Sequence, residues 1–98
     1  MRLYLTGSRF FGNAREDSDY DYLGQYTKTD LDGLLGIGYE VGSVCLVGPN
    51  RSEDIFLVNN VEKFLKARNL LKELPLSNYP KEHHGYLWKR ALDVIEGK

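Results

Sequence analysis

Residues 7–23 read GSRFFGNAREDSDYDYL, and two features of this stretch indicate the fold of the chain. The first is Gly7-Ser8, which lies between a predicted strand over residues 2–6 and a predicted helical turn over residues 9–12. The second is residues 19–23, where polar and bulky side chains alternate and tyrosine is frequent, as is typical of a strand. Residues 13–18 are polar and predict a loop. The chain is therefore expected to begin with a strand, a short helical turn and a second strand.

Gly7 and Ser8 are candidates for binding a phosphate group. Glycine lets the backbone approach a ligand closely, and backbone amides at the start of a helix favour an anion. The Ser8 hydroxyl adds one hydrogen bond. Arg9 follows directly and is a candidate contact for a triphosphate, with a surface salt bridge as the alternative.

Three aspartates are candidate metal ligands and catalytic residues. Asp19 and Asp21 are two residues apart on a predicted strand, so both carboxylates are expected on one face of the sheet. A divalent cation relieves their repulsion, and oxygen ligands suit Mg²⁺ or Mn²⁺, which also bind substrate phosphates. Asp54, at the start of the apolar strand 54–58, is the candidate third carboxylate. Glu53 competes for this role but is expected on the opposite face. Such a set fits two-metal catalysis of phosphoryl displacement.

The rest of the chain predicts a small α/β (α+β) fold, in which helices cover a sheet. The expected elements are a short helix capped by Thr29 or Asp30 and ending at Leu35, a hairpin over residues 44–58, a helix from residue 61 to Pro75, and a helix from Pro80 to about Glu96.

Length and composition exclude several classes of protein. A chain of 98 residues is expected to form a single domain, residues 1–98. Its net charge of −1 gives no indication of a polyanion partner, and its 42% hydrophobic content argues against disorder. The single cysteine, Cys45, excludes an internal disulfide and a cysteine-based zinc site. Neither a signal peptide nor a membrane span is recognised, so we expect a soluble, cytoplasmic protein that does not contact membranes.

Gly7-Ser8, ten residues and then Asp19-x-Asp21 resemble the G-S-x10-D-x-D signature of the minimal nucleotidyltransferase family, in the DNA polymerase beta-like superfamily. The match is strengthened by further residues of the stretch, namely Arg9, Gly12, Ala14 and Ser18. Asp54, before an apolar strand, resembles the third metal ligand of the family. The resemblance covers residues 2–58 in order.

The resemblance implies a minimal nucleotidyltransferase fold and an enzyme that uses Mg²⁺ or Mn²⁺. It implies transfer of a nucleoside monophosphate from a nucleoside triphosphate, with ATP the expected donor, to an acceptor hydroxyl. The acceptor is a small molecule, a nucleic acid end or a protein. Gly7, Ser8 and Arg9 would bind the triphosphate, while Asp19, Asp21 and Asp54 would hold the metal.

Two departures from the family keep other functions open. From these 98 residues, we expect the helix that precedes the first strand in the family to be missing, and we expect no room for an acceptor-binding domain. The alternative is a catalytically weak or inactive nucleotidyltransferase-fold binding protein, antitoxin-like or an inhibitor, that acts through a protein partner. A third reading is the catalytic half of a two-chain enzyme with a separate helical partner. A homodimer is also expected, because apolar surface would need covering.

Overall fold

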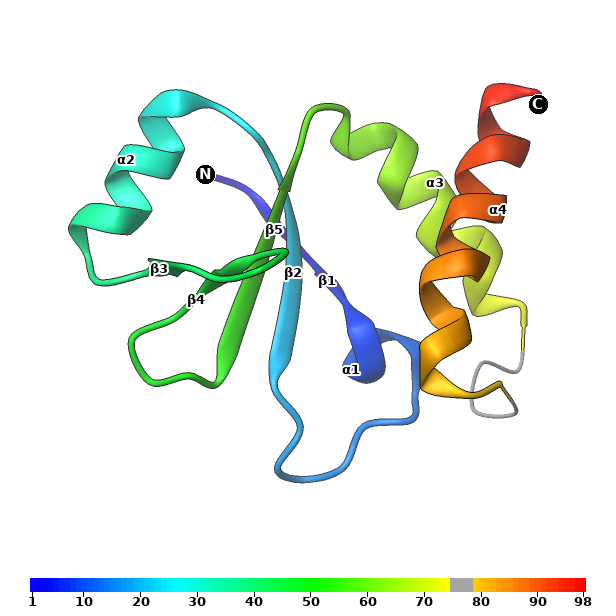
Figure 1. Ribbon diagram of the computed structural model, residues 1–98, viewed down its shortest axis with the longest axis horizontal. Helices are drawn as coiled ribbons and strands as arrows, with labels where there is room; N and C mark the ends of the chain where they lie inside the picture. The colour runs from blue at the N-terminus through cyan, green and yellow to red at the C-terminus, as the bar shows by residue number, and fades with distance from the viewer. Residues whose placement is uncertain (75–78) are drawn as a thin grey trace. The chain divides into compact units, whose positions relative to one another are not determined.

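The computed structural model describes residues 1–74 and 79–98, and these contain a five-stranded mixed sheet and four α-helices (Figure 1). The elements are β1 (Leu3–Thr6), α1 (Gly7–Phe11), β2 (Tyr20–Gln25), α2 (Lys28–Gly36), β3 (Glu40–Val41), β4 (Leu46–Val47), β5 (Glu53–Val58), α3 (Val61–Lys72), a 3₁₀ turn (Lys81–His83) and α4 (His84–Glu96). This content confirms the predicted α+β fold class.

The chain groups into two compact units, residues 1–61 and residues 62–98, and each is described by itself. The first unit holds the sheet, and the second holds α4 and all of α3 except its first residue, Val61. That residues 1–98 act as one domain stays a prediction.

The sheet has the strand order β1-β2-β5-β4-β3. β2 and β5 run parallel, and every other neighbouring pair is antiparallel. The predicted hairpin is present as β4 and β5, although β4 begins at Leu46, later than expected. The core of the sheet unit includes Ile55 (0% exposed) and Leu23 (4% exposed). β3 was not predicted, because two residues are too few to carry a strand pattern and it exists only by pairing with β4.

Helix α1 begins at Gly7, two residues earlier than the helical turn predicted over residues 9–12. Gly12 was expected inside the helical turn, but it ends the helix instead. Its φ of 82° is left-handed, and its N–H donates to the Ser8 carbonyl at 3.0 Å. A left-handed residue cannot continue a right-handed helix, and glycine adopts that conformation without steric penalty.

Helix α2 was expected to be capped by Thr29 or Asp30, and this prediction was wrong by two or three residues. Thr27 is the N-cap, because its Oγ1 accepts a hydrogen bond from the Asp30 N–H at 3.1 Å. The Thr27 hydroxyl also donates to Asp30 Oδ2 at 2.8 Å. Threonine followed three residues later by an acid is a variant of the capping box, so Asp30 completes the cap from inside the helix.

In the second unit, α3 and α4 are joined by packing and charge. The rings of Phe64 and Trp88 lie 6.2 Å apart, and Lys63 forms an ion pair with Glu96. Helix α3 ends at Lys72, and the residue expected to end it, Pro75, lies outside the described residues. No helix in the described residues is long and apolar enough to cross a bilayer.

Candidate functional site

The register of the sheet places Thr6, Asp21 and Asp54 in one row across three neighbouring strands. Asp21 in β2 is the Cα partner of Thr6 in β1 and of Asp54 in β5. Neighbouring strands lie about 4.8 Å apart, and partner residues project to the same face of a sheet. Two half-buried carboxylates that are far apart in the sequence therefore meet on one face.

Gly7 lies directly against the carboxylate of Asp21. A Cβ built at Gly7 would overlap Asp21 Oδ2, and Gly7 has a left-handed φ of 69°. Glycine is therefore required at this position for two reasons, the backbone conformation and the close approach of the carboxylate. Ser8 follows in α1 and is half-buried. The structure thus brings the predicted Gly7-Ser8 turn and the predicted aspartate strand together.

Asp19 does not belong to the strand that was predicted over residues 19–23, because β2 begins at Tyr20. The β1–β2 ladder ends at the pair Thr6 and Asp21, where the chain turns into α1. Asp19 is left with no strand partner on that side and is exposed in the last position of the loop. Its role as a metal ligand stays a prediction.

Arg9 holds the loop that leads to Asp19. Its Nη2 donates to the carbonyls of Ser18 at 2.7 Å and Glu16 at 3.1 Å, and its Nε donates to Ser18 at 3.2 Å. The guanidinium carbon also lies 4.0 Å from the centre of the Tyr20 ring, a cation–π contact. These contacts fit Arg9 as a residue that positions the loop, and its contact with a triphosphate stays a prediction.

The hydroxyl of Thr6 was not singled out from the sequence. Thr6 is 5% exposed, and its Oγ1 has no hydrogen-bond partner among the described residues. It is the N-cap of α1 but makes no capping hydrogen bond with its side chain. A buried polar atom without a partner is unusual in proteins. Only the strand register, which the sequence does not reveal, places this hydroxyl beside Asp21.

The fit to a divalent cation can be judged from these oxygens. Asp21, Asp54 and Thr6 supply hard oxygen donors from three adjacent strands, and this donor type suits Mg²⁺ or Mn²⁺. Within residues 1–74 and 79–98, however, no group of three or more His, Cys, Asp or Glu side chains is arranged to hold a metal ion. Asp21 and Asp54 thus offer the carboxylate oxygens that a divalent cation would use, and the metal site of three aspartates stays a prediction.

Cys45 lies near the carboxylates of Asp21 and Asp54, a proximity that the sequence did not reveal. Burial raises the pKa of the Cys45 thiol, and the negative charges of Asp54 and Asp21 raise it further. Cys45 is half-buried immediately before β4. The Cys45 thiol therefore reports on the charge at Asp21 and Asp54.

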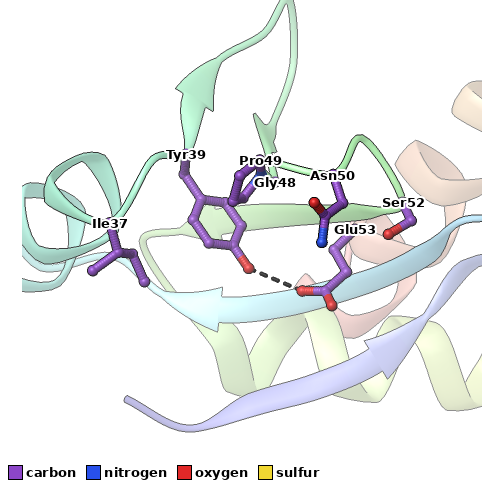
Figure 2. A pocket seen from close by; sticks show the side chains of 7 residues that line it. All are labelled: Ile37, Tyr39, Gly48, Pro49, Asn50, Ser52 and Glu53. Carbon is purple, nitrogen blue, oxygen red and sulfur yellow. Dashed lines mark hydrogen bonds between the residues drawn. The ribbon is translucent and has the colours of Figure 1, made fainter.

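A pocket of about 230 Å³ lies away from these residues, at the turn between β4 and β5 (Figure 2). Its lining consists of Ile37, Tyr39, Gly48, Pro49, Asn50, Ser52 and Glu53. Glu53 was considered from the sequence only as a competitor of Asp54. The remaining lining residues carry no motif that could have marked them.

Comparison with known proteins adds no relative to this picture. No protein-family model, curated protein or solved structure matches the chain.

Proposed function

We propose that this protein is a nucleotidyltransferase that moves a nucleoside monophosphate from a nucleoside triphosphate, with ATP the expected donor, to an acceptor hydroxyl. The observation that carries the proposal is the meeting of Asp21 and Asp54 on neighbouring parallel strands, with Gly7 against the Asp21 carboxylate. The family signature would require these residues to meet, and nothing in the local sequence compels the chain to bring them together.

In this proposal the residues of the site have separate roles. Asp21 and Asp54 hold a divalent metal, and Asp19, at the end of the loop before β2, is the third proposed ligand. Gly7 and Ser8 provide a close backbone approach for the triphosphate. Arg9 positions the loop by its hydrogen bonds to Ser18 and Glu16.

The metal would supply charge neutralisation at the phosphates and a lower pKa for the acceptor hydroxyl. Asp54 lies at the start of β5, where it could accept the proton of that hydroxyl or orient it.

One set of observations favours the second candidate function, a nucleotidyltransferase-fold protein that binds a protein partner. β3 is an edge strand, and the apolar side chains of Val41 and Val44 in and beside it are 73% and 78% exposed. Exposed edge strands offer unpaired backbone groups to another chain. A homodimer or a separate helical protein could cover this edge. Analytical ultracentrifugation of wild type and Val41→Lys would detect the homodimer.

The test of the enzyme proposal is calorimetric titration of ATP in the presence of Mg²⁺. We expect binding to require the metal and to be lost in Asp21→Asn and in Asp54→Asn, two changes that keep side-chain shape. Asp32→Asn, exposed on α2, removes the same charge elsewhere and is expected to bind as wild type does.

Transfer is then assayed with ATP labelled at the α-phosphate against small-molecule, nucleic acid and protein acceptors. Metal-dependent binding with transfer of label would support the enzyme. Metal-dependent binding without transfer to any acceptor would favour the binding protein. Loss of binding in Asp32→Asn to the same extent, or no binding at all, would contradict a nucleotide site at Asp21 and Asp54.

A further inference from the structure

The pocket at the β4–β5 turn combines one carboxylate with apolar and aromatic surface. Figure 2 shows Tyr39 and Glu53 pointing toward each other, and the Tyr39 hydroxyl donates to Glu53 Oε2 at 2.9 Å. Asn50 and Ser52 lie beside Glu53 and add polar oxygen atoms. The Tyr39 ring, Ile37 and Pro49 supply the apolar part of the lining.

The residues that line the pocket carry negative charge only. Glu53 is the single charged residue among the seven that line the pocket, and no lysine, arginine or histidine is among them. Arg51, in the same turn, lines a separate hollow of about 210 Å³ on the other side of Gly48 and Pro49. An anion would therefore meet a carboxylate without a compensating cation, whereas a cation would find an acceptor.

The hydrogen bond from Tyr39 fixes the Glu53 carboxylate in place. Burial raises the pKa of Tyr39, and the neighbouring Glu53 raises it further, so the phenol remains a donor near neutral pH. Only Oε2 of Glu53 accepts from Tyr39, which leaves Oε1 and the second lone pair of Oε2 available to a ligand. The face of the Tyr39 ring can attract a cation as well.

Two backbone hydrogen bonds close the turn that forms part of the pocket. The Gly48 N–H donates to the Glu53 carbonyl at 2.7 Å, and the Arg51 N–H donates to the Gly48 carbonyl at 2.9 Å. Arg51 has a left-handed φ of 56°, a strained conformation for a residue with a side chain. This turn carries Asn50 and Ser52, which line the pocket.

We propose that this pocket binds a small organic cation that carries an ammonium group on an apolar or planar body. The ammonium group would contact Glu53 with help from Asn50 and Ser52, and the body would lie on Tyr39, Ile37 and Pro49. This site is independent of the proposed nucleotidyl transfer, because Glu53 and Asp54 are consecutive in β5 and face opposite sides of the sheet.

The experiment is a nuclear magnetic resonance titration of the ¹⁵N-labelled full chain with 2-phenylethylammonium chloride. 2-Phenylethanol and phenylacetate are the neutral and anionic comparators of nearly the same shape. For the ammonium compound we expect saturating shifts with a Kd on the order of 1 mM. They should concentrate on the backbone amides that surround the pocket, namely Tyr39, Gly48, Asn50, Ser52 and Glu53.

The variants test which group makes the contact. Glu53→Gln keeps the length of the side chain, removes its charge and is expected to weaken binding at least about fivefold. Glu16→Gln makes the same change at an exposed position outside the pocket and should leave the Kd within about twofold of wild type.

Three outcomes would overturn the proposal. The alcohol or the phenylacetate could shift the same amides as strongly, the shifts could fall elsewhere, or none could appear at about ten times the expected Kd. The comparison of three probes on the wild-type chain requires no variant, so the test stands even if Glu53→Gln does not fold.

Discussion

Replacing Thr6 by valine should make the protein more stable, although it removes a hydroxyl group from the site. Valine has nearly the shape of threonine. The Thr6 side chain is 5% exposed, and its Oγ1 has no hydrogen-bond partner among the described residues. A buried polar group without a partner costs about 1–3 kcal/mol. Because α1 makes no capping bond with this side chain, the usual penalty for losing an N-cap hydroxyl does not apply.

We therefore expect Thr6→Val to raise the free energy of unfolding by about 1–2 kcal/mol. For a chain of this length, that gain corresponds to an increase in Tm of roughly 4–8 °C per kcal/mol. The matched control is Thr6→Ser, which keeps the hydroxyl, removes a buried methyl group and should lower stability by about 1 kcal/mol.

Urea unfolding followed by circular dichroism measures both changes. Fluorescence would report poorly on the sheet, because the single tryptophan, Trp88, lies in the helical unit. Hydrogen exchange of the β1 and β2 amides would localise the effect. A less stable Thr6→Val protein would refute the reasoning, since it would mean that the hydroxyl makes a hydrogen bond in solution.

The same pair of variants also bears on the proposed nucleotide site. If Mg²⁺ and ATP bind at Asp21 and Asp54, the Thr6 hydroxyl gains a ligand atom as a possible hydrogen-bond partner. The stability gain of Thr6→Val should then shrink when Mg²⁺ and ATP are added. A gain that is identical with and without them would indicate that no ligand reaches this row of residues.

Three further predictions concern single positions. Gly7→Ala should lower the free energy of unfolding by at least about 2 kcal/mol, because the new Cβ would overlap Asp21 and the φ at this position is left-handed. Gly12→Ala also has a left-handed φ but open space around it, so it should lower the free energy of unfolding by only about 1 kcal/mol. Equal losses of the two variants in urea unfolding would contradict this. Arg51→Gly should be more stable than Arg51→Ala by about 1 kcal/mol, since only glycine relieves the positive φ, and thermal melts of the two variants decide it. Burial and the nearby carboxylates raise the pKa of Cys45, so its thiol stays protonated in the folded state above its ordinary value of 9.0. The corresponding stability is present below that value and is lost as the pH rises through the folded pKa. Unfolding free energies between about pH 8 and pH 10 should therefore fall more steeply in wild type than in Cys45→Ala.

Much of the sheet unit could be predicted because its signals are local. The alternation in residues 19–23 predicts the start of β2 to within one residue, and both the end of β2 and the start of α1 are predicted to within two residues. The errors in strand boundaries arise where pairing with a neighbouring strand determines where a strand begins or ends. Asp19 fits the alternation, but the ladder stops at Asp21 because β1 has already turned into α1.

The candidate site was only partly predictable for the same reason. The alternation of side chains along a strand predicts the face on which Asp21 lies. No local sequence signal predicts the register of β2 against β5 that brings Asp54 beside it. The Thr6 hydroxyl and the Cys45 thiol join this region through pairing with other strands, so no motif could mark them. The pocket at Tyr39 and Glu53 likewise depends on how α2 leads into β3 and how the β4–β5 turn closes.

The parallel pairing of β2 with β5 has a consequence for how fast the protein folds. Gln25, at the end of β2, illustrates the chain separation involved, because its side-chain amide donates to the Asn59 carbonyl and accepts from the Val61 N–H, 34 and 36 residues along the chain. Contacts this distant require closure of a long loop before they stabilise anything, which slows folding. The β4–β5 hairpin can form early from local contacts. Asp21 and Asp54 would then meet only in the late, rate-limiting phase, so the site would be absent from any early intermediate.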